Sequence, residues 1–327
     1  EDDNRHVHVC GQEVCKNCGQ NVKLSEHKCY IQKPDSRRMV AEAASAKQVG
    51  KTIFFDFECM QETGEHVVNL AVAAYQDDSK NTVAAAVENS SGQMVTAKVA
   101  CIFGFTTDNL ARRGTPAFNA NEVRDNFMVW LCNAKHKGYT AIAHYGKGYD
   151  FSICRRWAYD NTNKVSGIVE SGSKNMTFKI NGVRFVDSFN LISQPLAKFP
   201  KTFGLKELRK GHFPHWFNTL ANQTYIGAFP PLETFKPEQK KPKARAELLA
   251  WYEENKSKQY DFARECTSYC VSDVLLLKDG ITRFRQQFAT TTGLDCLKYT
   301  TIASICNMTY RHHHMPPDSI AVLEKKF

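Results

Sequence analysis

The stretch Thr52-Ile-Phe-Phe-Asp-Phe-Glu-Cys59 places two acidic residues in a run that otherwise suits a protein core. Its β-branched and aromatic residues predict a β-strand. Because side chains alternate along a strand, Asp56 and Glu58 share one face, and Phe55 and Phe57 share the other. Neighbouring carboxylates repel each other and lose hydration, and a cation between them offsets both effects. The stretch therefore predicts a site for a hard divalent ion such as Mg²⁺ or Mn²⁺, with a strand end in solvent as the alternative.

The composition is that of an ordinary globular protein large enough for a sizeable core. The chain has 327 residues, of which 42% are hydrophobic and 24% charged, and its net charge is +9. This basic excess suits a polyanionic partner, although proteins without one share it. No apolar run is long enough to span a bilayer, and the N-terminus is polar and acidic, so we expect neither a membrane segment nor a signal peptide.

Four of the 12 cysteines lie in the first thirty residues. Cys15-Lys-Asn-Cys18 and His27-Lys-Cys29 provide four sulfur and nitrogen ligands, the set that tetrahedral Zn²⁺ prefers. Four protein ligands fill the coordination shell, so the predicted zinc would be structural. Cys10 is the first substitute for one of these ligands, and a set of free thiols is the alternative. The remaining cysteines are scattered, which indicates an intracellular, reducing compartment.

The rest of the chain predicts an α/β protein in which strands precede and alternate with helices. Residues 34–50 read as a linker with a short helix. We expect strands at 53–57, 67–75, 99–105 and 139–143, a strand pair within 165–187 that turns at Asn181-Gly182, and helices at 119–137, 150–158, 201–210, 243–286 and 298–314.

Three acidic motifs stand in order along these elements: Asp56-x-Glu58 on a strand, Tyr149-Asp150 after a glycine turn, and Tyr269-x-x-x-Asp273 on a late helix. A helix places residues four apart on one face, so Tyr269 and Asp273 are neighbours. Asp150 could instead cap the helix that follows it. Together the motifs resemble the three exonuclease motifs of proofreading DNA polymerases.

Two further motifs narrow the resemblance to protein-primed family B DNA polymerases, organellar and viral, including those of virus-like DNA transposons. Ser188-Phe189-x-x-Ile192 is similar to their Ser/Thr-Leu-x-x-hydrophobic motif, and Lys210-Gly-His-Phe213 to their Lys-x-x-hydrophobic motif. His27-Lys-Cys29-Tyr-Ile and the segment 185–218 are similar to the transposon type. The chain departs from the family where Tyr145-Gly146 occupies the place of an asparagine that positions the single-stranded 3′ end.

The resemblance implies a ribonuclease H-like 3′-5′ exonuclease fold, in which a mixed sheet is flanked by helices, with a small N-terminal zinc-binding module. It also implies hydrolysis of the 3′-terminal phosphodiester of single-stranded DNA with two Mg²⁺ or Mn²⁺ ions. The implied ligands are Asp56, which would bridge both ions, and Glu58, Asp150 and Asp273.

Other residues receive roles from the same resemblance. Tyr269 would orient the attacking water, and Lys210 would offset charge on the phosphate. The implied DNA contacts are Ser188, Phe189, Tyr145 and Tyr149.

The resemblance also predicts four segments: a zinc-binding module at 1–33, a linker at 34–50, the exonuclease domain at 51–290 and the start of a polymerase domain at 291–327. The polymerase motifs, an Asp-x-x-Ser-Leu-Tyr-Pro strand and an Asp-Thr-Asp turn, do not occur in the chain, so we expect a fragment without polymerase activity. Its expected partners are single-stranded 3′ ends, primer-template DNA, the missing polymerase domain and a terminal protein primer, in a nucleus or at a viral replication site. The alternatives are a nuclease-inactive DNA-binding module, a stand-alone nuclease and a ribonuclease of the same fold.

Overall fold

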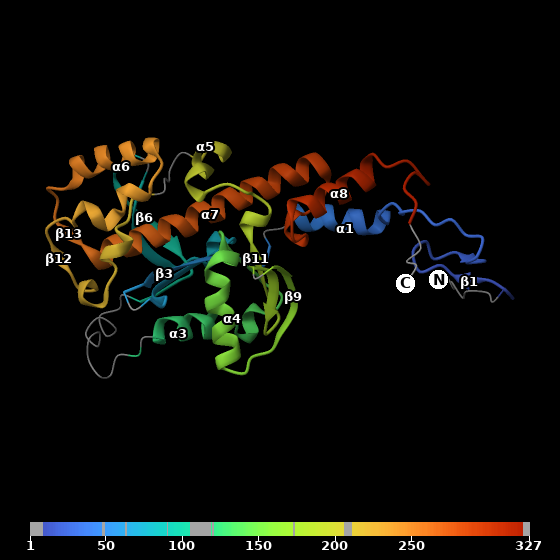
Figure 1. The fold of residues 1–327 in the computed structure, drawn as a ribbon, viewed down its shortest axis with the longest axis horizontal. Coiled ribbons are helices and arrows are strands. Elements are labelled where there is room, and N and C mark those ends of the chain that lie inside the picture. Colours follow the sequence, from blue (N-terminus) through green and yellow to red (C-terminus); the bar gives the residue numbers. More distant parts are fainter. Residues whose placement is uncertain are drawn as a thin grey trace. The chain divides into compact units, whose positions relative to one another are not determined.

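A computed structural model describes residues 9–47, 50–62, 64–89, 91–104, 119, 121–172, 174–205 and 211–322 (Figure 1). The chain divides into two compact units, which are described separately below. One unit is Gln48–Gln287, and the other combines Glu1–Lys47 with Phe288–Phe327.

A seven-stranded sheet organises the larger unit, with the strand order β7-β4-β3-β8-β11-β10-β9. Its central strands β3, β8 and β11 are parallel to one another, and the other pairings are antiparallel. The strands are β3 (Thr52–Met60), β4 (Val67–Tyr75), β7 (Cys101–Phe103), β8 (Thr140–Ala143), β9 (Val165–Ser171), β10 (Lys174–Ile180) and β11 (Val183–Asp187). This mixed sheet with flanking helices confirms the α/β class.

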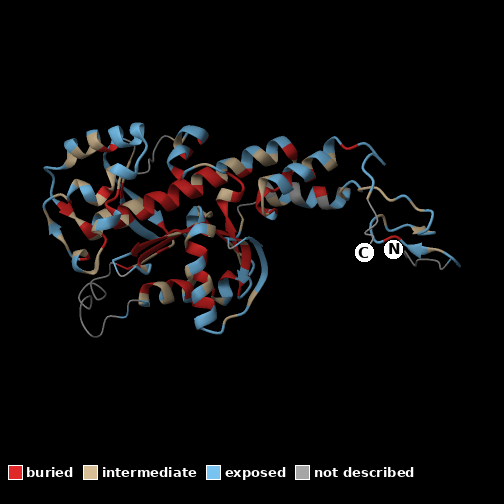
Figure 2. Ribbon diagram, in the orientation of Figure 1, coloured by how far each residue is buried: buried red, intermediate tan, exposed pale blue. Residues whose placement is uncertain are grey.

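Helices α3 (Glu122–Leu131) and α4 (Asp150–Asp160) cover one face of the sheet (Figure 1). Phe55 and Phe57 point to this face, as the alternation along β3 predicts, and are 0% and 3% exposed. The ring centre of Phe127 from α3 lies 5.8 Å from that of Phe55 and 5.1 Å from that of Phe57. Figure 2 shows the resulting concentration of buried residues in the sheet and its inner helix faces.

Helix α7 (Phe262–Thr292) runs along the other face of the sheet (Figure 1). Asp56 and Glu58 lie on this face, where a side-chain oxygen of each is within 4.8 Å of the Sγ atom of Cys270 on α7. The Cys270 Sγ atom from this helix is 3.7 Å from the backbone oxygen of Asp56. Fully buried residues of α7, such as Val271 and Val274, pack this layer. The acidic face of β3 is therefore enclosed by a helix.

Smaller elements complete the larger unit. The helices and strands are β5 (Val83–Glu88), β6 (Met94–Val99), α5 (Phe199–Phe203), β12 (Ile226–Gly227), α6 (Pro242–Asn255) and β13 (Tyr260–Asp261). The 3-10 turns are η1 (Asp78–Lys80), η2 (Ala134–His136), η3 (Gly146–Gly148), η4 (Ser188–Asn190), η5 (Leu196–Lys198), η6 (His215–Phe217), η7 (Leu220–Asn222), η8 (Leu232–Phe235) and η9 (Pro237–Gln239).

The smaller unit joins segments from the two ends of the chain. Its elements are β1 (Glu13–Val14), β2 (Asn21–Val22), α1 (Ser36–Lys47), η10 (Cys296–Lys298) and α8 (Ile302–His313). Tyr30 pairs with Ala321 in an antiparallel bridge. The N–H of Val322 donates to the carbonyl of Cys29 at 2.8 Å. Among the described residues, no helix has the length and apolar character needed to cross a membrane.

The expected elements are mostly present, with five corrections of extent. The β10–β11 turn lies at Asn181 and Gly182, whose φ angles of 49° and 85° suit a tight hairpin. The first correction concerns the helix predicted at 119–137. The observed helix α3 ends at Leu131. A separate 3-10 turn follows, capped by Asn133, whose side chain accepts from the N–H of Lys135.

The second correction concerns the helix predicted at 201–210. The observed helix α5 begins earlier and ends at Gly204, whose φ of 64° terminates it, while residues 206–210 lie outside the described part of the chain. The third concerns the strand predicted at 99–105, which divides between the end of β6 and β7, and residue 105 is also outside that part.

The last two corrections concern the number of elements. The helix predicted at 243–286 is two helices, α6 and α7, with the short strand β13 between them. The strand pair predicted within 165–187 has a third strand, β9, beside β10 and β11.

Gly280 allows α7 to pack against the ring of Phe199, because a Cβ atom at this position would overlap that ring. Phe199 is fully buried and contacts His144 and Phe203, so it has little room to move. In an open helix position Gly→Ala stabilises by about 1 kcal/mol. Here we expect Gly280→Ala to lower the free energy of unfolding by about 1–2 kcal/mol in urea titrations.

A double-mutant cycle tests the cause of that loss. In a Phe199→Leu background, Gly280→Ala should cost less than it does in the original chain. An equal cost in both backgrounds would show that the Phe199 ring is not responsible.

Candidate active site and metal-binding groups

Strand β3 brings the first acidic pair together. One side-chain oxygen of Asp56, one of Glu58 and the Sγ atom of Cys270 all lie within 4.8 Å of one another, a grouping that could hold a metal ion. Asp56 is half-buried, and Glu58 is 6% exposed. The pairing of β3 with β4 shifts at this point, because Glu58 faces Leu70 while Cys59 faces Val68. A β-bulge at this end of the strand is a common way to redirect side chains at a site.

A cavity of about 560 Å³ opens over this pair. Its lining includes Asp56, Glu58, Tyr149, Tyr269 and Asp273, and therefore residues from all three acidic motifs. Asp273 is 4% exposed. The structure thus places three of the four predicted acidic ligands, together with the predicted water-orienting tyrosine, around one space.

Asp150 lies beside this space without being one of its lining residues. It is the first residue of α4, with Tyr149 at the cap position, and it is 2% exposed. Burial raises the pKa of Asp150 to about 7, against the opposing effect of backbone hydrogen bonds from Asp150 itself and from Phe57. Its Oδ1 atom is buried and has no hydrogen-bond partner among the described residues. A buried carboxyl oxygen in this state is stabilised by a proton or a cation.

Three of the predicted DNA contacts form an aromatic side of the cavity. Tyr145, Tyr149 and Phe189 all line it. Tyr145 is 45% exposed and has a left-handed φ of 62°. Its ring meets that of Phe189 edge-on, with 5.2 Å between ring centres. Exposed aromatic faces of this kind are able to stack on nucleobases.

Asp187 holds this aromatic segment in place. Its carboxylate accepts backbone N–H groups from Tyr145 at 2.9 Å, Lys147 at 3.1 Å and Phe189 at 2.9 Å. Burial raises the pKa of Asp187, and those same hydrogen bonds counteract the rise. The carboxylate therefore fixes the loop before α4 to the end of β11.

Ser188, another predicted DNA contact, is not among the described residues that line the cavity. Ser188 is fully buried, its hydroxyl donates to the carbonyl of Ala143 at 3.0 Å, and it lies 2.9 Å from Nδ1 of His144. Its contact with DNA stays a prediction. Lys210 lies outside the described residues.

His215 is a cavity residue that the sequence analysis missed. Its Nδ1 atom is 3.8 Å from Oε2 of Glu58, and its ring centre is 5.7 Å from that of Tyr269. The local sequence Pro214-His215-Trp216 has no spacing relation to the acidic motifs, so only the folded chain reveals this neighbour.

A buried amide network attaches the His215 loop to β3 and β4. Asn218 donates to the carbonyl of Cys59 at 3.0 Å, and Asn69 donates to Asn218 at 2.8 Å and to Gln223 at 2.9 Å. Asn69 is the extra residue of β4 at the register shift, between Val68, which faces Cys59, and Leu70, which faces Glu58. The bulge thus provides the point at which the loop is fixed.

The four predicted N-terminal ligands also come together. The ligand atoms of Cys15, Cys18, His27 and Cys29 all lie within 4.8 Å of one another. The Cys15 and Cys29 sulfurs are 3.6 Å apart, and the Cys18 sulfur is 3.5 Å from Nε2 of His27. Backbone hydrogen bonds from Cys18 and Asn17 lower the pKa of Cys15 to about 6, which favours the thiolate form that binds metals. Cys10 is exposed and is not a member of this group.

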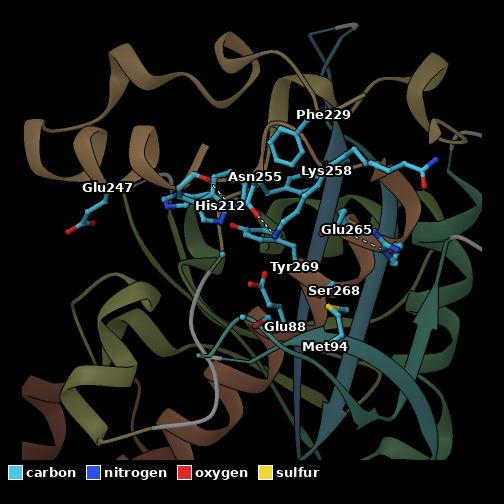
Figure 3. A pocket seen from close by; sticks show the side chains of 18 residues that line it. Glu88, Met94, His212, Phe229, Glu247, Asn255, Lys258, Glu265, Ser268 and Tyr269 are labelled. Atoms are coloured by element: carbon cyan, nitrogen blue, oxygen red, sulfur yellow. Dashed lines mark hydrogen bonds and ion pairs between the residues drawn. The ribbon is translucent and has the colours of Figure 1, made fainter. Parts of the chain in front are cut away.

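A second cavity, of about 500 Å³, shares Tyr269 with the first (Figure 3). It lies among α6, the start of α7 and the β5–β6 hairpin, and its aromatic lining includes Phe229 and Trp251. Among the described lining residues, Lys258 and Arg264 are offset by Glu88, Glu247 and Glu265, so these residues have no cationic excess that would select a phosphate.

A model of the family described as DNA polymerase type B, organellar and viral, matches residues 131–327. The chain therefore belongs to this family of DNA polymerases. The matched region contains Asp150, Tyr269 and Asp273, and it begins after β3.

Three curated relatives are each described as a probable DNA polymerase. The protein of Ascobolus immersus is 29% identical over 153 residues, which are 44% of this chain and 13% of the relative. For Neurospora intermedia the values are 28% over 151 residues, 43% and 15%, and for Podospora anserina 26% over 145 residues, 44% and 11%. The matched segment is thus a small part of each relative's length.

Among solved structures, the chain is similar to phi29 DNA polymerase in a complex with primer-template DNA and incoming nucleotide substrates. The TM-score is 0.37 and the sequences are 12% identical, over 77% of this chain and 32% of that chain.

We expect Asn218→Ala to lower the free energy of unfolding by about 1–3 kcal/mol, because it leaves buried polar groups of Cys59, Asn69 and Gln223 without their partner. Urea unfolding monitored by circular dichroism measures this loss. Gln239→Ala, at an exposed position, is the control and should change stability by less than about 0.5 kcal/mol. If both variants behave alike, the network does not stabilise the loop.

Proposed function

We propose that the segment 51–290 is a ribonuclease H-like 3′-5′ exonuclease that removes nucleotides from the 3′ end of single-stranded DNA. The observation that carries this proposal is the convergence of Asp56, Glu58 and Asp273 with Tyr269 around one cavity. These residues come from a central strand and from a helix more than two hundred residues later, and a metal-dependent phosphodiesterase needs such a set.

The residues fit two divalent ions, Mg²⁺ or Mn²⁺. Asp56 and Glu58 provide oxygen ligands within 4.8 Å of each other. The buried Asp150 has an oxygen that accepts no hydrogen bond from the part of the chain that the structure describes. Bound ions would supply Lewis acidity toward the scissile phosphate and an attacking water.

The chain's own groups would bind and orient the substrate. The Tyr269 hydroxyl would hold the attacking water in line with the terminal phosphodiester. Phe189 and Tyr145 would stack on the last bases of a frayed strand, and Tyr149 would form the adjoining wall. Asp187, which fixes this loop, would position them. Ser188 and Lys210 keep the roles proposed from the family resemblance, a strand contact and a charge beside the phosphate.

His215 adds a group that the family resemblance did not supply. At 3.8 Å from Glu58 it would restrict the rotamers of that carboxylate when both are charged. We propose that it is a positioning residue for Glu58.

The N-terminal group is proposed to hold a structural Zn²⁺. Around tetrahedral zinc, sulfur atoms are separated by about 3.8 Å, and a sulfur and a nitrogen by about 3.6 Å. The separations of 3.6 Å for Cys15–Cys29 and 3.5 Å for Cys18–His27 fit this geometry. The zinc-binding module would comprise 1–33, with 34–50 as the linker and 291–327 as the beginning of a polymerase domain.

In a longer protein of the kind that its relatives represent, the segment would be the proofreading domain of a protein-primed DNA-directed DNA polymerase. Its partners would then be primer-template DNA, the polymerase domain and a terminal protein, in the nucleus or at a viral replication site. Two other functions remain distinguishable by experiment: a DNA-binding module without nuclease activity and a ribonuclease.

We expect Asp56→Asn to reduce 3′-5′ digestion of a 5′-labelled single-stranded DNA by at least about 100-fold, because it removes charge that binds the ions. Digestion is measured with Mg²⁺ and with Mn²⁺, beside an RNA of the same sequence. Glu233→Gln, at an exposed position, should leave the rate unchanged. Without metal, Asp56→Asn should be at least as stable as the original chain, because it removes repulsion with Glu58.

Each outcome selects one function. Unchanged digestion by Asp56→Asn would overturn the metal assignment, and digestion of RNA alone would indicate a ribonuclease. Retained DNA binding without any digestion would favour the inactive module.

For the N-terminal group, we expect a chelator to release about one zinc per chain and to loosen the pairing next to Cys29. Hydrogen exchange of the Val322 amide, which donates to the Cys29 carbonyl, should then accelerate. Cys18→Ser should lose the zinc, and Cys10→Ser should keep it. Equal zinc content in these two variants would contradict the ligand assignment.

A further inference from the structure

Cys270 is an unexpected neighbour for a magnesium site. It follows Tyr269 in the third acidic motif, at a position to which the sequence analysis assigned no role. The structure places its Sγ atom within 4.8 Å of side-chain oxygens of both Asp56 and Glu58. Cys270 is fully buried, and its thiol donates to the Asp56 backbone oxygen, with 3.7 Å between the two atoms.

Thiol sulfur and carboxylate oxygen select different metals. Mg²⁺ and Mn²⁺ favour oxygen and gain little from sulfur, whereas Zn²⁺ and Cd²⁺ bind thiolates well. Three protein ligands with one position left open is also a common zinc geometry. A thiol within coordination reach of two carboxylates therefore changes which ion binds most tightly.

We propose that Cys270, Asp56 and Glu58 form a mixed sulfur–oxygen site for a thiophilic divalent ion, Zn²⁺ or Cd²⁺, which competes with Mg²⁺ for the two carboxylates. The S–H bond of Cys270 breaks as the sulfur–metal bond forms, and the proton leaves to solvent. No electron is transferred. The ion occupies the carboxylates that hydrolysis needs, so its binding inhibits. This effect on hydrolysis rests on the proposed nuclease, whereas the binding itself does not.

The location explains why this thiol would act as a ligand and not as a redox sensor. Oxidants and disulfide partners need access to sulfur, and Cys270 has no exposed surface. A metal ion, in contrast, would reach the sulfur through the carboxylates that line the cavity.

Ultraviolet titration of the full chain with Cd²⁺ tests the proposal, because each thiolate bound to cadmium adds a charge-transfer band. The proposed zinc ligands Cys15, Cys18 and Cys29 would bind cadmium in every variant, so the result is read as a difference between variants. We expect Cys270→Ser to lose the amplitude of one thiolate. Asp56→Asn combined with Glu58→Gln should lose the same amplitude although Cys270 is present.

Cys266→Ser is the matched control, because Cys266 is equally buried on α7 one turn earlier and is not a member of the metal-binding group. It should retain the full amplitude. Equal amplitudes for Cys270→Ser and the original chain would overturn the proposal. So would an equal loss of amplitude in Cys270→Ser and Cys266→Ser.

A second measurement separates this inference from the proposed function. In digestion with Mg²⁺, Cys270→Ser should require at least about tenfold more Zn²⁺ for half-inhibition than the original chain. If no variant digests DNA, the cadmium titration still decides the binding. If Asp56→Asn abolishes digestion while Cys270→Ser keeps the full cadmium amplitude, the proposed nuclease function is supported and the proposed sulfur–oxygen site is wrong.

Discussion

Carboxyl groups gathered around β3 impose the main energetic constraint on this chain. Glu58, Asp150 and Asp273 are 6%, 2% and 4% exposed, so each has lost most of its hydration. Like charges in such surroundings destabilise a fold unless protons, cations or hydrogen bonds offset them. The opposite face of the same strand supplies compensating stability, because Phe55 and Phe57 are packed there among aromatic rings. One face of β3 therefore destabilises the fold electrostatically, and its other face contributes part of the apolar core that offsets this effect.

Local patterns in the sequence predicted much of this arrangement. Alternation along the first acidic stretch placed Asp56 and Glu58 opposite the phenylalanines, because strand geometry has a period of two. Asn181-Gly182 predicted its hairpin, since both residues readily adopt positive φ. The four-residue spacing of Tyr269 and Asp273 placed both on one helix beside the cavity. These features depend on neighbours in the chain, and a sequence displays such neighbours directly.

Features that depend on distant segments were not predictable in this way. His215 approaches Glu58, and Cys270 approaches both carboxylates, only because the sheet, the loop and α7 pack together. The sequence around Ser188 resembles a motif that binds a DNA strand, yet the fold directs the Ser188 hydroxyl to the Ala143 carbonyl. Asp150 likewise has an oxygen with no hydrogen-bond partner among the described residues because the core encloses it. Motif spacing gives the order of chemical groups, whereas burial and hydrogen bonding decide which of them face the cavity.

The bulge in β4 would allow the loop that carries His215 to change in evolution independently of the sheet. Glu58 faces Leu70 and Cys59 faces Val68, so removal of Asn69 would leave both cross-strand pairs intact. The same removal would delete the amide that holds Asn218 and Gln223, and with them the loop carrying His215. Loss or gain of one codon could therefore detach or attach a positioning loop while the sheet that carries the acidic pair stays the same.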